Sequence, residues 1–316
     1  MGNILVTGSA GQIGSELVPA LRDLYSDNAV VAGWNRTPLP DEISAGPNVA
    51  LDVTDFDAIN KIVKNFDITS IFHMSSILSA TAEAYRNTAH DVNINGTVNI
   101  LESAYQNGID KVILPSSIAA FGTKTPNAMT PNDTIQNPDT VYGISKVFGE
   151  LIGNYYDSKL GLDVRGVRLP GVISWKTEPT AGTTDYAVAM FYEAIKKDSY
   201  ECYLSPDTSL PMMYMPDAIN SLIMLYQADY EDLIHHSDFN VHAMTFTPRE
   251  LATEVTRINP KFEIDYKVDP VRQSIADSWP SSLDDSAARK EWDWKPHYSL
   301  RELAEDMYKN LVVKLS

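Results

Sequence analysis

Three glycines at three-residue spacing follow the first apolar run of the chain. The run covers residues 3–7, and Gly8, Gly11 and Gly14 come directly after it. In a strand–loop–helix unit these glycines permit a tight turn, a close approach to a pyrophosphate and close packing of the helix on the sheet. The helix N-terminus then offers free N–H groups to the phosphates. This pattern predicts a dinucleotide site, and the alternative is a glycine-rich turn that binds nothing.

A tyrosine and a lysine stand four residues apart, as Tyr142 and Lys146, in a segment with helical periodicity. Both side chains therefore lie on one helix face. Tyrosine has an ordinary pKa of about 10 and is a poor base near neutral pH. A neighbouring ammonium favours the phenolate, so we expect Lys146 to lower the pKa of Tyr142. With Ser117 to hold the same substrate oxygen, the three residues predict proton transfer at an alcohol or a carbonyl.

Strands and helices that alternate along the first half of the chain must position these residues. Apolar runs predict strands at residues 3–7, 29–34, 49–51, 70–73, 111–114 and 164–168. Helical periodicity covers residues 12–25, 55–66, 92–105 and 142–159. Such alternation is typical of βαβ units. We expect an α/β fold with a doubly wound, parallel, Rossmann-type sheet.

Longer loops separate the elements after residue 169. Helices are predicted at 185–197, 216–226, 283–291 and 300–311, and a strand at 262–266. Thr247 and Glu250 form a capping-box pattern that starts another helix. We therefore predict a dinucleotide-binding domain at 1–169. Residues 170–316 mainly form a smaller substrate lobe, with segments that return to the first domain.

Composition excludes several classes of partner. The chain of 316 residues has 25 Lys and Arg against 42 Asp and Glu, a net charge of −17. Nucleic acids and anionic membranes need a basic footprint, so we expect neither as a partner. The single cysteine, Cys202, cannot form an internal disulfide. With no apolar run of about 18 residues and no targeting pattern, a cytoplasmic location is expected.

Other catalytic patterns are absent from the sequence. The six histidines show no HxxxH spacing, and His235 and His236 would point apart on a helix, so no metal site is expected. The serine-hydrolase elbow Gly-x-Ser-x-Gly does not occur.

The glycine motif, Ser117 and the Tyr142-x-x-x-Lys146 pair together resemble the extended short-chain dehydrogenase/reductase family. The likeness covers the whole chain and includes residues 283–286 and 294–296. More narrowly, residues 178–188, 210–218 and 278–280 resemble the L-threonine 3-dehydrogenases of the short-chain type. The resemblance implies oxidation of the L-threonine β-hydroxyl by NAD, which yields 2-amino-3-oxobutyrate.

Two positions depart from the family pattern. Asn35 stands at the end of the second strand, where the family usually has Asp, and Arg36 follows it. Asn35 can bond the ribose hydroxyls, but it does not repel a 2′-phosphate, so the choice between NAD and NADP stays open at this point. Ser75 and Ser76 replace smaller residues after the fourth strand.

We expect the site residues to fall into three groups. The catalytic residues are Ser117, Tyr142 and Lys146. The cofactor-binding residues are Gly8, Gly11, Gln12, Ile13, Asn35, Arg36, Asp52, Val53, Met74, Ser75, Asn93, Tyr142, Lys146, Leu169 and Pro170. The substrate-binding residues are Ser79, Ser117, Tyr142, Thr183, Thr184, Asp185 and Trp279. Four have a structural alternative, which is helix capping for Asp52, a helix-dipole partner for Asp185, backbone bonding for Asn93 and core packing for Trp279.

Three functions remain in competition at this point. The first is an NAD-dependent L-threonine 3-dehydrogenase. The second is a nucleotide-sugar 4-epimerase or dehydratase, which needs a larger pocket and cationic contacts for a diphosphate. The third is a dinucleotide-sensing protein without turnover. Apolar residues on the 142–159 helix, including Phe148, Leu151, Ile152 and Tyr155, also predict a homodimer.

Overall fold

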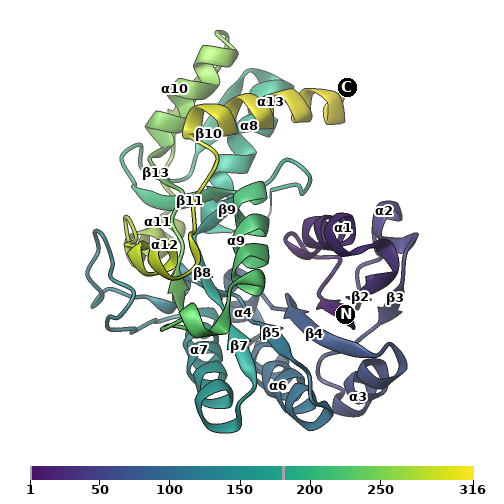
Figure 1. Cartoon of the computed structure of the whole chain (residues 1–316). Coiled ribbons are helices and arrows are strands. Elements are labelled where there is room, and N and C mark those ends of the chain that lie inside the picture. The colour runs from purple at the N-terminus through teal and green to yellow at the C-terminus, as the bar shows by residue number, and fades with distance from the viewer. Residues whose placement is uncertain (1, 180–181) are drawn as a thin grey trace.

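A six-stranded parallel sheet organises the computed structural model, which describes residues 2–179 and 182–316 (Figure 1). The strand order is β3-β2-β1-β4-β5-β7, so the doubly wound sheet is confirmed. Its strands are β1 (Asn3–Thr7), β2 (Val30–Trp34), β3 (Asn48–Ala50), β4 (Ile68–His73), β5 (Lys111–Ile113) and β7 (Asp163–Arg165). Met1, and Thr180 and Ala181 of the 178–188 stretch, lie outside the described residues.

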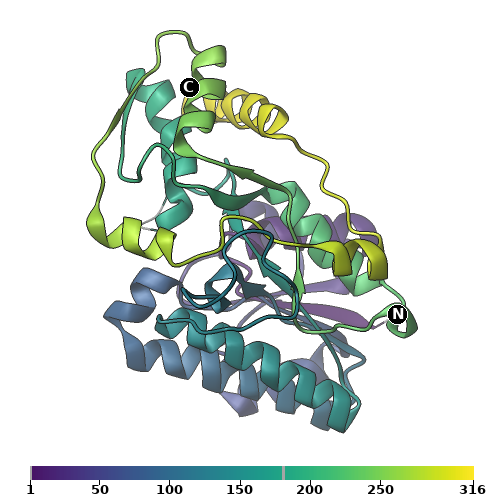
Figure 2. The same cartoon turned by 90° about the vertical axis from the view of Figure 1, so that its left-hand side faces the viewer.

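Helices cover both faces of this sheet. One face carries α1 (Gly14–Tyr25) and α9 (Met215–Gln227), and the other carries α3 (Phe56–Asn65), α6 (Gly96–Asn107) and α7 (Val141–Leu160) (Figure 2). Successive strand residues point to opposite faces. Ile4 and Val6 accordingly pack into the core under α1 and α9, whereas Leu5 packs into the core under α3 and α6.

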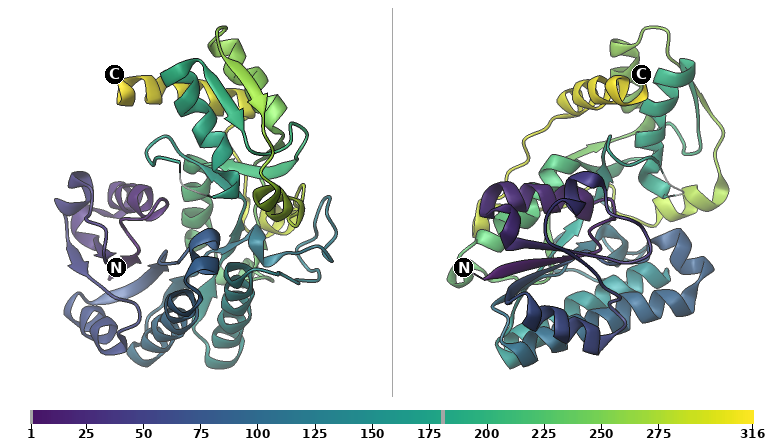
Figure 3. Two further views of the ribbon diagram at one scale, coloured as in Figure 1. Left: turned by 180° about the vertical axis from the view of Figure 1, so that it is seen from behind. Right: turned by 90° about the vertical axis from the view of Figure 1, so that its right-hand side faces the viewer.

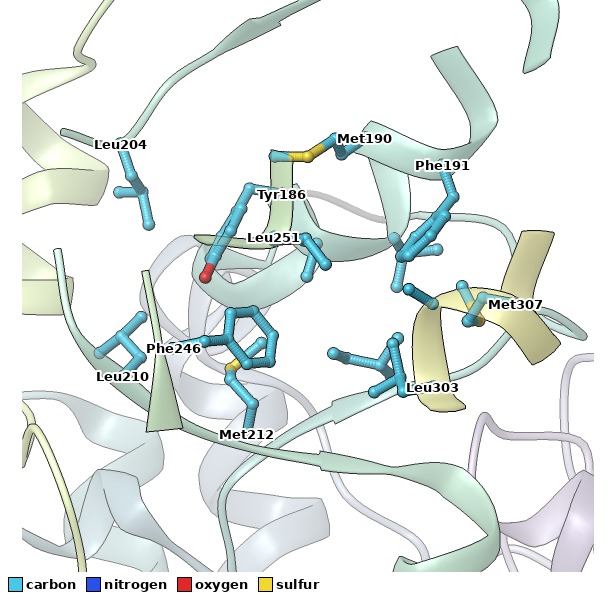
Figure 4. Packing of buried hydrophobic residues seen from close by; sticks show 14 of the residues in the cluster. Tyr186, Met190, Phe191, Leu204, Leu210, Met212, Phe246, Leu251, Leu303 and Met307 are labelled. Atoms are coloured by element: carbon cyan, nitrogen blue, oxygen red, sulfur yellow. The ribbon is translucent and has the colours of Figure 1, made fainter. Parts of the chain in front are cut away.

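A second lobe has a core of its own. Helices α8 (Tyr186–Lys197), α10 (Pro248–Ile258) and α13 (Leu300–Leu315) surround a sheet of β13 (Met244–Phe246), β11 (Leu210–Tyr214) and β9 (Gly171–Ile173) (Figure 3). Tyr186, Phe191, Phe246, Leu303 and Met307 meet in its interior (Figure 4). The Thr247 capping box opens α10 as predicted. Because α9 packs with α1, the 170–316 segment also contributes to the first core, while the exact domain boundary stays a prediction.

Shorter elements complete the chain. The remaining strands are β6 (Ser116–Ser117), β8 (Val167–Leu169), β10 (Ser199–Cys202), β12 (Phe239–Asn240) and β14 (Glu263–Tyr266). The remaining α-helices are α2 (Asp41–Ser44), α4 (Ser79–Ala84), α5 (Arg86–Ala89), α11 (Pro270–Asp277) and α12 (Ser286–Trp292). Within the described residues, no helix combines the length and apolar character that a membrane crossing requires.

The structure corrects three local predictions. The strand expected at 164–168 breaks at Gly166, whose N–H donates to the His236 carbonyl at 2.8 Å, and β8 joins β6 and β12 instead of the main sheet. A Cβ on Gly166 would lie 2.3 Å from the Leu114 carbonyl oxygen, so a larger residue does not fit at this break. The helix expected at 92–105 begins earlier, with α5 and a π-helical turn at His90–Asn95. His235 and His236 lie in a loop, not on a helix.

Replacing Gly14 with alanine should destabilise the protein. A Cβ at Gly14 would stand 2.3 Å from the Gly8 carbonyl oxygen, which is backbone and cannot rotate away. Overpacking of this kind costs roughly 1–3 kcal/mol. Gly149→Ala is the matched control because its Cβ would meet only a Leu114 methyl at 3.7 Å, inside α7. In urea, the free energy of unfolding should be lower for Gly14→Ala than for the wild type and unchanged for Gly149→Ala. Equal stability of the two variants would contradict the packing argument.

Candidate active site

The loop between β1 and α1 has the shape that a pyrophosphate needs. Gly8 has a φ of +65°, a left-handed conformation that glycine adopts without strain. A Cβ there would lie 2.8 Å from the Ser75 nitrogen, so the loop also sits tightly on the end of β4. The Ser9 N–H donates to the Gly33 carbonyl at 3.0 Å, which fixes the loop beside β2. The residues therefore fit a dinucleotide whose phosphates rest on the N-terminus of α1.

A cavity of about 340 Å³ lies between the carboxyl ends of the strands and the second lobe. Thirteen predicted site residues line it: Gln12, Ile13, Met74, Ser79, Ser117, Tyr142, Lys146, Leu169, Pro170, Thr183, Thr184, Asp185 and Trp279. The other predicted residues, which are Gly8, Gly11, Asn35, Arg36, Asp52, Val53, Ser75 and Asn93, lie outside its lining. Lys146 is the only lysine or arginine among the described residues that line the cavity.

Ser117, Tyr142 and Lys146 meet in this cavity from two elements. Ser117 ends β6, and α7 carries the other two. Thr140 caps α7 by accepting from the Gly143 N–H at 3.0 Å, so Tyr142 stands in the first turn. The Lys146 Nζ lies 5.4 Å from the centre of the Tyr142 ring and donates to the Pro115 carbonyl at 2.9 Å. The four-residue spacing on α7 therefore does bring the Tyr142 ring and the Lys146 ammonium close together.

The pKa of Tyr142 moves opposite to the expected direction. Burial raises the pKa of Tyr142 to about 12, and the hydrogen bond with Ser117 opposes that shift. Burial also lowers the pKa of Lys146 to about 8, against the pull of the Glu150 charge. Desolvation of the phenolate is the largest cause of the raised pKa of Tyr142, and the Lys146 ammonium donates its hydrogen bond to the Pro115 carbonyl, not to Tyr142. The expectation that Lys146 lowers the pKa of Tyr142 is therefore wrong for the protein without a ligand.

A buried ion pair behind the site joins α7 to β8. The Arg168 guanidinium donates to both carboxylate oxygens of Glu150, at 2.9 and 2.8 Å, and both side chains are 3% exposed. The Ser116 hydroxyl, next to Ser117, also donates to Glu150. The Arg168 Nη1 donates further to the Asn132 carbonyl at 2.7 Å. Sequence analysis missed this network because its members become neighbours only through the fold.

His73, at the end of β4, is a second residue that sequence analysis missed. Its Nδ1 lies 2.9 Å from the Thr7 hydroxyl and its Nε2 lies 3.4 Å from the Thr97 hydroxyl. Burial, together with the charge of Lys146, lowers the pKa of His73 to about 3. The Thr7 oxygen also accepts from the Ser75 N–H at 3.2 Å. A polar residue at the carboxyl end of a parallel strand was the available signal.

Asn93 holds the loop beneath the site. Its side chain accepts from the Ile77 N–H at 2.7 Å and donates to the Ile77 carbonyl at 3.0 Å. It also donates to the Ser145 hydroxyl at 3.3 Å. These bonds match the structural alternative named for Asn93, that of a backbone anchor. Its predicted contact with the cofactor stays a prediction.

One group of side chains outside the cavity has metal-ligand spacing. Ligand atoms of Asp157, Asp163 and His236 lie within 4.8 Å of one another. Arg165, however, donates to both oxygens of Asp163 at 2.7 Å each. A fixed positive charge on the same carboxylate disfavours a cation, and we assign no metal there.

Comparison with known proteins gives consistent matches over the whole chain. Residues 4–241 match the family model described as the NAD dependent epimerase/dehydratase family. The solved L-threonine dehydrogenase of Clostridium difficile is 48% identical, with a TM-score of 0.97 over 99% of this chain and 98% of that one. The mitochondrial L-threonine 3-dehydrogenase of Bos taurus is 44% identical over 96% of this chain and 81% of its own. A monomeric L-threonine 3-dehydrogenase from a metagenome is 41% identical, with a TM-score of 0.94 over 99% and 100% of the two chains.

The stability of the protein should fall with acid through His73. Its pKa is about 3 when folded against an ordinary 6.5, so the unfolded chain binds one more proton between these values. Stability from this group is complete above pH 6.5 and is lost as the pH falls toward 3, by up to ~1.4 kcal/mol per unit. Urea unfolding between pH 4 and 6 gives the free energy of unfolding at each pH. For His73→Gln this free energy should change less with pH than for the wild type, by about 1.4 kcal/mol per pH unit. The exposed His90→Gln should keep the slope, and a His73→Gln slope equal to wild type would contradict the assignment.

Proposed function

The chain belongs to the NAD dependent epimerase/dehydratase family, and we propose that it is an NAD-dependent L-threonine 3-dehydrogenase. The observation that carries the proposal is the composition of the cavity. It combines the Ser117–Tyr142–Lys146 group with the hydroxyl-rich turn at residues 183–185. The reaction oxidises the substrate β-hydroxyl and gives 2-amino-3-oxobutyrate.

Proton transfer is assigned to the three residues at the end of β6 and on α7. The Ser117 hydroxyl holds the substrate oxygen, and the Tyr142 oxygen accepts its proton. Lys146 bonds the ribose and keeps a positive charge beside the developing phenolate. When bound, NAD accepts the hydride from the β-carbon and adds its own positive charge to the site. A positive charge on a bound cofactor would favour the Tyr142 phenolate, against the burial that raises the pKa of Tyr142.

Recognition of an amino acid needs partners for a carboxylate and an ammonium. Thr183 and Thr184 stand in the turn that precedes α8, and Ser79, which begins α4, lines the same cavity. Their hydroxyls, and the N–H groups at the start of α8, suit the carboxylate. Asp185 lines the same cavity, and we assign it to the ammonium. Trp279, which follows α11, also lines the cavity.

The two other functions fit the cavity less well. A nucleotide-sugar epimerase must hold a diphosphate, yet Lys146 is the only lysine or arginine that the described lining offers. A dinucleotide sensor gains nothing from a base, a lysine and an oxygen-binding serine in one cavity.

The test of the proposal is NADH formation at 340 nm with L-threonine. L-serine, L-allo-threonine and D-threonine serve as controls for the β-methyl group and for both stereocentres. Turnover should be fastest with L-threonine. Absence of turnover with L-threonine, together with turnover of a UDP-sugar, would replace the proposal with the epimerase.

Tyr142→Phe should keep cofactor affinity and lose most turnover. The variant keeps the ring and removes only the oxygen that accepts the proton. General-base catalysis contributes typically ~10²–10⁴-fold, which sets the expected loss in kcat. Calorimetric titration with NADH supplies the affinity and steady-state assays supply kcat. Undiminished kcat would remove Tyr142 as the base.

The exposed face of α7 supports a homodimer. Of the residues expected there, Leu151 and Tyr155 are 63% and 50% exposed, and Ile144 on the same helix is 52% exposed. Phe148 is only half-buried, and Ile152 packs against the core under α3 and α6, which corrects its assignment to this face. Burial of such side chains is worth roughly 25 cal/mol per Å² of apolar surface. Light scattering should give twice the chain mass, and Leu151→Glu should halve it. A monomeric mass for the unmodified chain would contradict the dimer. The relative from a metagenome is such a monomer.

A further inference from the structure

The end of β2 is the place where a bound dinucleotide presents its adenosine ribose. β2 lies between β1 and β3, with Thr7 beside Gly33 and Trp34 beside Ala50. The phosphate loop is fixed to Gly33 through Ser9. Asn35 follows β2 directly. With the pyrophosphate on the loop, the residue after β2 faces the ribose 2′ position, where an acid selects NAD by repelling a phosphate.

The Asp52 carboxylate, which follows β3, interacts with both Asn35 and Arg36. Asn35 and Arg36 are both exposed. One oxygen of Asp52 accepts from the Thr54 N–H at 3.0 Å and from the Thr54 hydroxyl at 2.7 Å. The Asn35 amide bonds the same carboxylate, and Arg36 balances its charge. The Asp52 carboxylate is therefore occupied by its neighbours within the protein.

We propose that the Asn35–Arg36 end of β2 admits a 2′-phosphate, so that the protein binds NADP as well as NAD. The Arg36 guanidinium offers several N–H donors in a planar arrangement that matches phosphate oxygens. The Asn35 amide is a neutral donor that serves a hydroxyl or a phosphate equally. The net charge of −17 does not forbid this, because salt at 0.1 M screens exposed charges beyond about 10 Å.

The inference rests on the dinucleotide-binding part of the proposed function, and binding alone tests it. Calorimetric titrations with 2′,5′-ADP and 5′-AMP isolate the 2′-phosphate from the rest of the cofactor. We expect 2′,5′-ADP to bind at least as tightly as 5′-AMP, and NADPH to bind within about tenfold of NADH. A preference for 5′-AMP and NADH of a hundredfold or more would overturn the inference.

Two variants assign the effect to residues. Asn35→Asp introduces the missing acid and should raise the ratio of the NADPH and NADH dissociation constants at least tenfold. Arg36→Ala should raise the same ratio and flatten the salt dependence of NADPH binding. Arg249→Ala, on the exposed surface of the second lobe, is the control and should leave the ratio unchanged. An unchanged ratio in both Asn35→Asp and Arg36→Ala would overturn the assignment.

The outcomes separate this inference from the proposed function. Binding of both dinucleotides without turnover of L-threonine supports the inference and rejects the dehydrogenase. Turnover with NAD together with refusal of NADPH and 2′,5′-ADP rejects the inference and leaves the dehydrogenase intact.

Discussion

The buried ion pair between Glu150 and Arg168 constrains how the elements that carry Ser117 and Tyr142 meet. Helix α7 carries Glu150 two turns after Tyr142 and one turn after Lys146, while Arg168 stands on β8 opposite Ser116. Desolvation of each buried ion costs several kcal/mol, which only well-aligned hydrogen bonds offset. The hydrogen bonds of this pair therefore form at one position of α7 relative to β6. In that position Ser117 and Tyr142 line a common cavity.

Periodicity was sufficient for the elements that bury one continuous face. The predicted strand at 3–7 and the helices at 55–66 and 142–159 agree with β1, α3 and α7 within a residue at each end. α4, with the sequence Ser-Ala-Thr-Ala-Glu-Ala, has no apolar stripe and gave no signal. The break at Gly166 was also invisible, because the His236 carbonyl to which the Gly166 N–H donates lies far away in the sequence.

In the site, too, local spacing predicts some residues and only the fold reveals the others. Tyr142 and Lys146 were predictable because helix geometry alone brings them together. His73 bonds Thr7 on β1 and Arg168 bonds Glu150 on α7, so both pairings exist only once the chain has folded. The raised pKa of Tyr142 belongs to this second kind, because burial is a property of the fold and not of the Tyr–Lys spacing.

The place of α9 has a consequence for synthesis of the chain. This helix comes from residues 215–227 and covers, together with α1, the face of the sheet that holds Ile4 and Val6. A nascent chain that ends near residue 169 would expose that apolar face to water. The first half of the chain consequently reaches its final packing only after residues 215–227 have left the ribosome, and a chain truncated before them keeps apolar surface exposed.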